Sequence, residues 1–290
     1  MACAQRPIVF PRCATILGVD VGEDFLDAAR LSGDQATLSY HRIALASLRR
    51  PVITSLAALI ADAFGNDTKG AIALVDSPRT PRDVDCSGPR MIVRSDAPGS
   101  RAIDASLREL LRTTFNGAMR PLSMFPTPRA SYFAACAMHR ACKPHLRAIA
   151  EELLGVRGKT FEGKVSGGTF TRFMLAGFAV FPALEQLGVR AFEAYPDLQM
   201  RLWSNGVSLA PKRERAEAIR VRRIICERLA AMLGVDNFDP PRTLDEADAA
   251  VLALSAAAAA RTKSLIELHS AAEGRFAIAL DKPQSREVQR

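Results

Sequence analysis

Acidic residues stand at the ends of apolar segments in several parts of this 290-residue sequence. Asp20 and Asp76 each end a short apolar run that predicts a buried strand, and Glu193 lies near the end of a third such run. Asp245 and Asp248 are three positions apart in an alanine-rich segment, so both can point from one side of a predicted helix. Any one of these acids could simply end a strand or cap a helix, but a converging set must be neutralised.

Converging carboxylates repel one another and raise one another's pKa values unless a cation lies between them. Hard oxygen ligands in this number suit Mg²⁺ or Mn²⁺. Two such ions, about 4 Å apart, can stabilise the attacking and leaving oxygens of a phosphodiester hydrolysis. The pattern therefore predicts a metal site with Asp20, Asp76 and Asp248 as ligands, and Glu193 and Asp245 as further candidate catalytic residues.

Alternating strands and helices must position these acids. Apolar runs bounded by Gly, Ser, Asn or Pro predict strands at 15–20, 25–31, 37–43, 70–76, 189–195 and 276–280. Helical spacing of apolar residues predicts helices at 46–64, 104–115, 130–154, 170–187, 212–233 and 244–261.

Strands followed by helices indicate an α/β fold, and the opening strand meander favours a mixed central sheet flanked by helices. Prolines at 7 and 11 predict a flexible tail over residues 1–14. We expect a single domain over 15–283, with a helical and loop insertion at about 77–168, and a second tail over 284–290.

The chain carries 39 Lys and Arg against 31 Asp and Glu, and this net charge of +8 favours an anionic partner, most often nucleic acid. Basic residues crowd the segment 212–228, where they can contact phosphates or form ion pairs along a solvated helix face. Arg129 can line a substrate cleft or belong to a rigid connector. The candidate nucleic-acid-binding residues are Arg129, Lys212, Arg213, Arg220 and Arg223.

The composition excludes several other classes of protein. Hydrophobic residues make up 48% and charged residues 24%, which is typical of a globular chain rather than a disordered or collagen-like one. No apolar run reaches the roughly 18 residues of a membrane span, and no secretory signal is visible at the N-terminus. Six scattered cysteines then predict reduced thiols, so we expect a cytoplasmic protein with no membrane partner.

Several short motifs, in order along the chain, carry a family resemblance. They are GVDVG at 18–22, VDSP at 75–78, SMFPTPR at 123–129, FEAYPD at 192–197, the basic segment 212–223, DEADA at 245–249 and EGRFAIALDKP at 273–283. With these motifs the chain resembles domain-of-unknown-function family four hundred and twenty-nine, a family of predicted nucleases with a ribonuclease H-like fold. The helix motif is also similar, more distantly, to the D-x-x-D-A segment of Holliday-junction resolvases.

The resemblance implies a ribonuclease H-like fold and metal-dependent cleavage of nucleic acid. Carried over by position, it implies Asp20, Asp76 and Asp248 as the metal ligands, with Asp245 and Glu193 next.

Two other functions stay open. GVDVG at 18–22 could be the first phosphate loop of a sugar-kinase-like or chaperone-like ATPase, although no later D-x-G stands at a strand end. A catalytically inactive nucleic-acid-binding protein would bind without metal.

Overall fold

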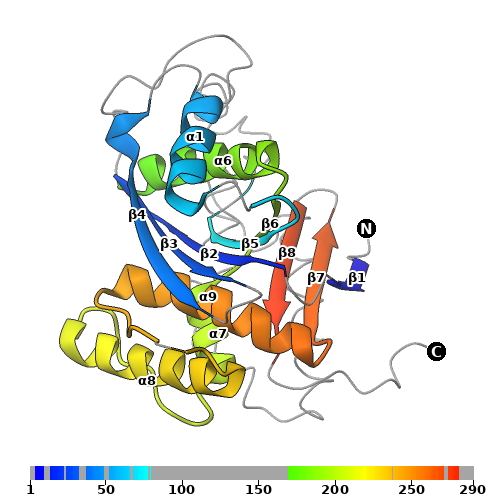
Figure 1. Ribbon diagram of the computed structural model, residues 1–290. Coiled ribbons are helices and arrows are strands. Elements are labelled where there is room, and N and C mark those ends of the chain that lie inside the picture. The colour runs from blue at the N-terminus through cyan, green and yellow to red at the C-terminus, as the bar shows by residue number, and fades with distance from the viewer. Residues whose placement is uncertain are drawn as a thin grey trace, which may run out of the picture.

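The computed structural model describes residues 4–9, 14–22, 24–32, 37–48, 52–65, 68–77, 79, 169–236, 238–270 and 274–280. These residues form a mixed α/β fold in which helices cover both faces of one sheet (Figure 1). Most of the expected insertion, with the helices predicted at 104–115 and 130–154, lies outside the described residues. Among the described helices, none is both long and apolar enough to cross a membrane.

The sheet has eight strands in the order β1-β7-β8-β6-β5-β2-β3-β4. Its strands are β1 (Ala4–Pro7), β2 (Ile16–Val21), β3 (Phe25–Leu31), β4 (Leu38–Ala44), β5 (Ile72–Asp76), β6 (Arg190–Glu193), β7 (Leu265–Ser270) and β8 (Gly274–Ala279). β2, β3 and β4 form the predicted antiparallel meander, which ends at one edge of the sheet, and β5 and β6 extend the sheet from β2 as parallel strands. A single parallel pair, Glu193 with Phe276, attaches the antiparallel strands β8, β7 and β1 to β6.

Two helical layers enclose the sheet. The helices are α1 (Val52–Phe64), α6 (Thr169–Gln186), α7 (Pro196–Trp203), α8 (Arg215–Leu233) and α9 (Leu244–Arg261), with a short 3-10 helix at Leu45–Ser47. α1 and α6 cover one face, whereas α9 covers the other, with α7 and α8 packed beside it (Figure 1).

Three elements differ from the sequence-based expectation. Ala4–Pro7, expected to be a tail, pairs with β7 at the edge of the sheet. Pro7 is tolerated there because it ends an edge strand, where a missing backbone N–H breaks no interior ladder. β7 and the eight-residue helix α7 were not predicted, although Pro196 at the first position of α7 is a signal for the start of a helix.

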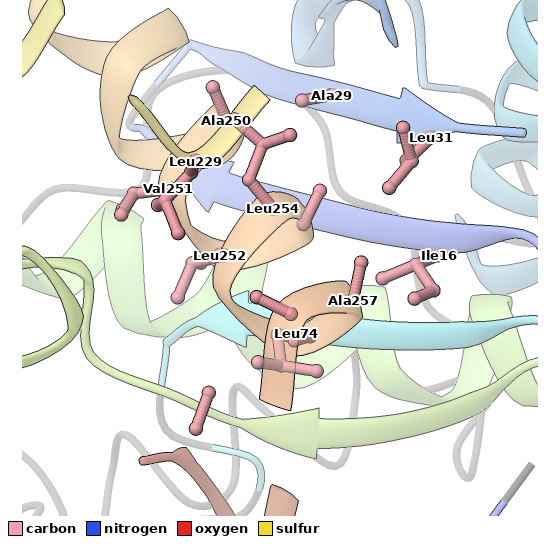
Figure 2. Packing of buried hydrophobic residues seen from close by; sticks show 14 of the residues in the cluster. Ile16, Ala29, Leu31, Leu74, Leu229, Ala250, Val251, Leu252, Leu254 and Ala257 are labelled. Atoms are coloured by element: carbon pink, nitrogen blue, oxygen red, sulfur yellow. The ribbon is translucent and has the colours of Figure 1, made fainter. Parts of the chain in front are cut away.

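α9 packs closely on β2 and β3, and alanines such as Ala250 and Ala257 are among the α9 residues of the buried cluster (Figure 2). A Cβ atom built on Gly18 of β2 would lie 1.9 Å from the backbone oxygen of Ala249. Thr243 and Glu246 form a capping box that fixes where α9 begins. These features hold the first turns of α9 against the middle of the sheet.

Gly18→Ala should therefore destabilise the protein by about 3 kcal/mol or more, because either β2 or α9 must move to admit the methyl group. Chemical denaturation measures this loss. Gly65→Ala is the matched control: Gly65 has a positive φ of 73° but open space around it, so it should cost only about 1–2 kcal/mol. Equal losses for both variants would contradict the close packing described here.

Candidate functional site

The sheet carries three acids side by side on its α9 face. Asp20 of β2 is the register partner of Asp76 in parallel β5 and of Asp27 in antiparallel β3. Side chains alternate between faces along a strand, and Leu17, Val19 and Val21 pack against the α1 and α6 side. Asp20 therefore shares the opposite face with Gly18, which meets α9.

The same alternation places Asp76 and Asp27. In β5, Ile72 and Leu74 belong to the cluster around α9, so Asp76 follows them onto that face. In β3, Ala29 and Leu31 belong to this cluster and Asp27 precedes them by two and four residues.

Asp248 completes the site from the helix above. It is buried with a relative exposure of 1% and sits next to Ala249, the residue that contacts Gly18. Its negative charge acts on both Asp20 and Asp76 and raises the pKa values of their carboxyl groups. The structure thus brings together the three acids that the sequence predicted as metal ligands.

Burial and mutual repulsion make the strand acids hard to ionise. Desolvation, followed by the charges of Asp248 and Asp76, raises the pKa of Asp20 well above its ordinary value. Desolvation also raises the pKa of Asp76 to about 7, against the opposing effect of Lys212. Hydrogen bonding with the Asp20 side chain opposes a smaller part of this rise in the pKa of Asp76.

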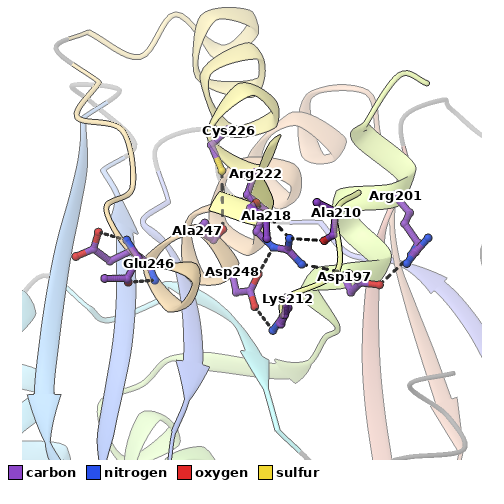
Figure 3. A network of polar contacts seen from close by, with 11 residues as sticks. Asp197, Arg201, Ala210, Lys212, Ala218, Arg222, Cys226, Glu246, Ala247 and Asp248 are labelled. Carbon is purple, nitrogen blue, oxygen red and sulfur yellow. Dashed lines mark hydrogen bonds and ion pairs between the residues drawn. The ribbon is translucent and has the colours of Figure 1, made fainter. Parts of the chain in front are cut away.

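Two cations hold Asp248 (Figure 3). The Lys212 ammonium donates to Oδ2 at 2.6 Å, and the buried Arg222 guanidinium lies 3.4 Å from Oδ1. Burial alone would lower the pKa of Lys212, but the charges of Asp248, Asp20 and Asp76 raise it overall. Lys212 therefore interacts electrostatically with all three predicted ligands.

Arg222 links Asp248 to a wider network. It is 1% exposed, and besides Asp248 it contacts Asp197 at 3.5 Å and the backbone oxygens of Ala210 and Ala218. Asp197 in turn accepts a hydrogen bond of 2.8 Å from Arg201 on the same helix (Figure 3). Neither Arg222 nor Asp197 was predicted as a site residue, although Arg222 interrupts the apolar positions 218, 221, 225 and 229 of α8 and so signals a buried charge.

Asp27 is a further acid that sequence reasoning missed. It is 5% exposed, and Arg42 of β4 binds both carboxylate oxygens at 2.8 and 2.9 Å. Burial raises the pKa of Asp27 despite this partner. The register of the β2–β3 hairpin places Asp27 opposite Asp20, and pairing the two predicted strands in this register would have identified Asp27 as a site residue.

The remaining predicted residues are more peripheral. Asp245 lies on the rim, 55% exposed and 3.6 Å from Arg42, and its charge contributes to the raised pKa of Asp20. Glu193 is not brought to the site, because it alternates with Phe192 and so faces α6, where it accepts a hydrogen bond from the backbone N–H of Arg79. Its position at a strand end was a sound signal, but it gave no information about the face.

Of the basic residues predicted to bind nucleic acid, Lys212 contacts the acidic site, whereas Arg220 and Arg223 make other contacts. Lys212 lies in the turn before α8 rather than in the helix, and Arg213 is exposed beside it. Arg220 forms an exposed ion pair with Glu217, and Arg223 donates to the backbone oxygen of Pro241 at 2.6 Å. These two contacts match the alternative of a solvated, ion-paired helix face. Arg129 lies outside the described residues.

No group of three or more His, Cys, Asp or Glu side chains within the described ranges is arranged to hold a metal ion. Asp248 is engaged by Lys212 and Arg222 rather than free to join Asp20 and Asp76. The neighbouring pair Asp20 and Asp76 still fits a magnesium-type ion, which is commonly bound through one or two carboxylates, with waters and substrate phosphates as the other ligands.

The sequence from residue 18 to residue 267 matches the family described as "Protein of unknown function (DUF429)". The chain belongs to this family. It matches no curated protein and no solved structure. The DUF429 match begins inside β2 and ends inside β7, so it includes Asp20, Asp76 and Asp248, and it confirms the resemblance to the family. The family description assigns no activity, so the function must be argued from the site.

The metal-free protein should lose stability as the pH rises from about 4 to about 7. Asp76 has a folded pKa of about 7 against an ordinary value of 3.8, so the folded state binds more protons than the unfolded state in this window. The stabilisation present below pH 4 is lost as the carboxyl ionises, by up to about 4 kcal/mol. Denaturation in a chelator at several pH values measures it, and Asp76→Asn should flatten the profile. An unchanged slope in the variant would contradict the assignment.

Arg222→Met should destabilise the protein by about 3–5 kcal/mol, because it leaves the buried Asp248 with a single cationic partner. Arg220→Met is the control on the same helix, since its ion pair with Glu217 is fully exposed and screened by solvent, so its loss should leave the stability nearly unchanged. Urea denaturation of both variants gives the comparison, and a loss below 1 kcal/mol for Arg222→Met would show that Asp248 does not depend on it.

Proposed function

We propose that this DUF429 protein is a metal-dependent nuclease that hydrolyses phosphodiester bonds of nucleic acid. The observation that carries the proposal is the pair of carboxyl groups of Asp20 and Asp76, in register at the carboxyl ends of two adjacent parallel strands and faced by Asp248. Their raised pKa values express an unmet demand for positive charge, which a divalent cation meets.

A ribonuclease H-like fold is part of this proposal. Its support is the mixed sheet, in which an antiparallel meander of β2, β3 and β4 is followed by the parallel strands β5 and β6. Further support is that α9, which carries the third acid, packs against β2, β3 and β5.

Asp20 and Asp76 would hold Mg²⁺ or Mn²⁺, which supplies Lewis-acid polarisation of the scissile phosphate. A two-metal form of the mechanism needs further ligands, for which Asp248 and the rim residue Asp245 are the candidates. Lys212, whose ammonium lies 2.6 Å from Asp248, stands beside these acids, where its charge can orient the phosphate backbone. Contacts to the phosphate backbone do not distinguish one base sequence from another. They therefore support nucleic acid as the substrate class without favouring a particular sequence.

The test is incubation of the purified protein with single- and double-stranded DNA and RNA, with and without Mn²⁺ or Mg²⁺. Asp20→Asn and Asp76→Asn should each lower metal-dependent cleavage by about a thousandfold, since the ion's contribution amounts to several kcal/mol. Asp62→Asn, exposed on α1 across the sheet, is the matched control and should cleave like the wild type. Glu193→Gln should also retain activity, because Glu193 faces α6.

Cleavage that survives in Asp76→Asn would defeat the proposal. Nucleic-acid binding that needs no metal and survives Asp20→Ala, with no cleavage by the wild type, would favour the inactive binding protein. Binding of ATP in place of nucleic acid would favour phosphotransfer.

A further inference from the structure

The positive charges around Asp248 differ in how firmly they are held. Arg222 is 1% exposed and makes four polar contacts, so it cannot leave without exposing a buried network. The Lys212 side chain is 56% exposed, and its ammonium reaches Asp248 from the surface. Of the two cations on Asp248, Lys212 is the one that can move away.

The local backbone also favours movement of Lys212. It lies in a turn closed by the hydrogen bond from the Glu214 N–H to the Pro211 oxygen at 2.9 Å, ahead of the first residue of α8. Rotation about the four side-chain bonds of a lysine carries its charge several ångströms without altering a helix or a strand.

A divalent cation and the Lys212 ammonium compete for the same charges. Lys212 interacts with Asp20, Asp76 and Asp248 together, so an ion bound by the first two residues would lie in its field. Two like charges a few ångströms apart in a partly buried pocket repel by several-fold more than the thermal energy.

We propose that the Lys212 ammonium is a built-in counter-ion of the acidic site, and that a divalent cation entering at Asp20 and Asp76 displaces it from Asp248. The inference rests on the proposed metal site and adds a gate to it, meaning a lysine charge that leaves Asp248 when the ion binds. In the metal-free protein Lys212 neutralises the pocket, and after displacement it is free to contact an anionic group at the rim.

The test compares Mn²⁺ binding by the wild type, Lys212→Met and Arg213→Met, using calorimetry. Lys212→Met keeps the length of the side chain but removes the competing charge, so its dissociation constant for Mn²⁺ should fall by about tenfold or more. Arg213→Met removes an equal charge from the next, exposed position and should bind like the wild type. Without metal, Lys212→Met should also melt at a lower temperature than Arg213→Met.

A second measurement uses the wild type alone and so does not depend on the folding of a variant. Acylation of lysines, quantified by mass spectrometry, should increase at Lys212 when Mn²⁺ is added, whereas the exposed Lys263 serves as the internal reference. Equal Mn²⁺ affinity in wild type and Lys212→Met, with unchanged labelling of Lys212, would overturn the gate and leave the metal site intact. Absence of Mn²⁺ binding in every form would overturn the metal site itself and the gate with it.

Discussion

The close approach of α9 to β2 is the contact on which the site depends. Gly18 leaves room for the backbone of Ala249, and the alanines of α9 let the helix lie against the sheet over its whole length. Because Asp248 directly precedes Ala249, this contact fixes the height of its carboxylate above Asp20 and Asp76. A larger residue at position 18 would lift the helix and separate the acids. The contact between Gly18 and the backbone of Ala249 therefore determines both how α9 packs on the sheet and where the Asp248 carboxylate lies.

This packing creates an electrostatic problem that the protein's own cations solve for Asp248 but only in part for Asp20 and Asp76. Three acids gathered on a buried face raise the pKa values of Asp20 and Asp76, and Asp248 is held by Arg222 and Lys212. Asp27 is treated in the same way by Arg42 at the edge of the sheet. Asp248 and Asp27 are each held by a long basic side chain that reaches them from a neighbouring element. The basic residues thus act first within the fold, and their number need not signal an anionic partner.

The sequence was most informative where periodicity and chemistry coincided. The apolar runs ending in Asp20 and Asp76 and the alanine-rich helix predicted β2, β5 and α9 almost to the residue, and the order of the acids predicted their convergence. The prediction from sequence failed where it depended on which face of the sheet a strand residue occupies. Glu193 faces α6 and Asp27 faces the site, and a shift of one position along a strand exchanges the two faces. It also failed for Arg222, because long-range pairing with Asp197 and Asp248 is set by how α7, α8 and α9 pack. Ala4–Pro7 was missed because its strand is specified by β7, more than 250 residues away.

The two cations on Asp248 are not equivalent, and their difference suits their positions. A guanidinium offers several donors in a fixed plane, so Arg222 can satisfy Asp197, Asp248 and two backbone oxygens at once and remain buried. An ammonium is a compact charge on a flexible stem, which suits Lys212 at the rim. Exchanging the two residue types would place the flexible lysine side chain at the buried position 222 and the arginine side chain at the exposed position 212. In the proposed displacement of Lys212, Arg222 would keep Asp248 oriented, so the acids would keep their arrangement while the counter-ion changes.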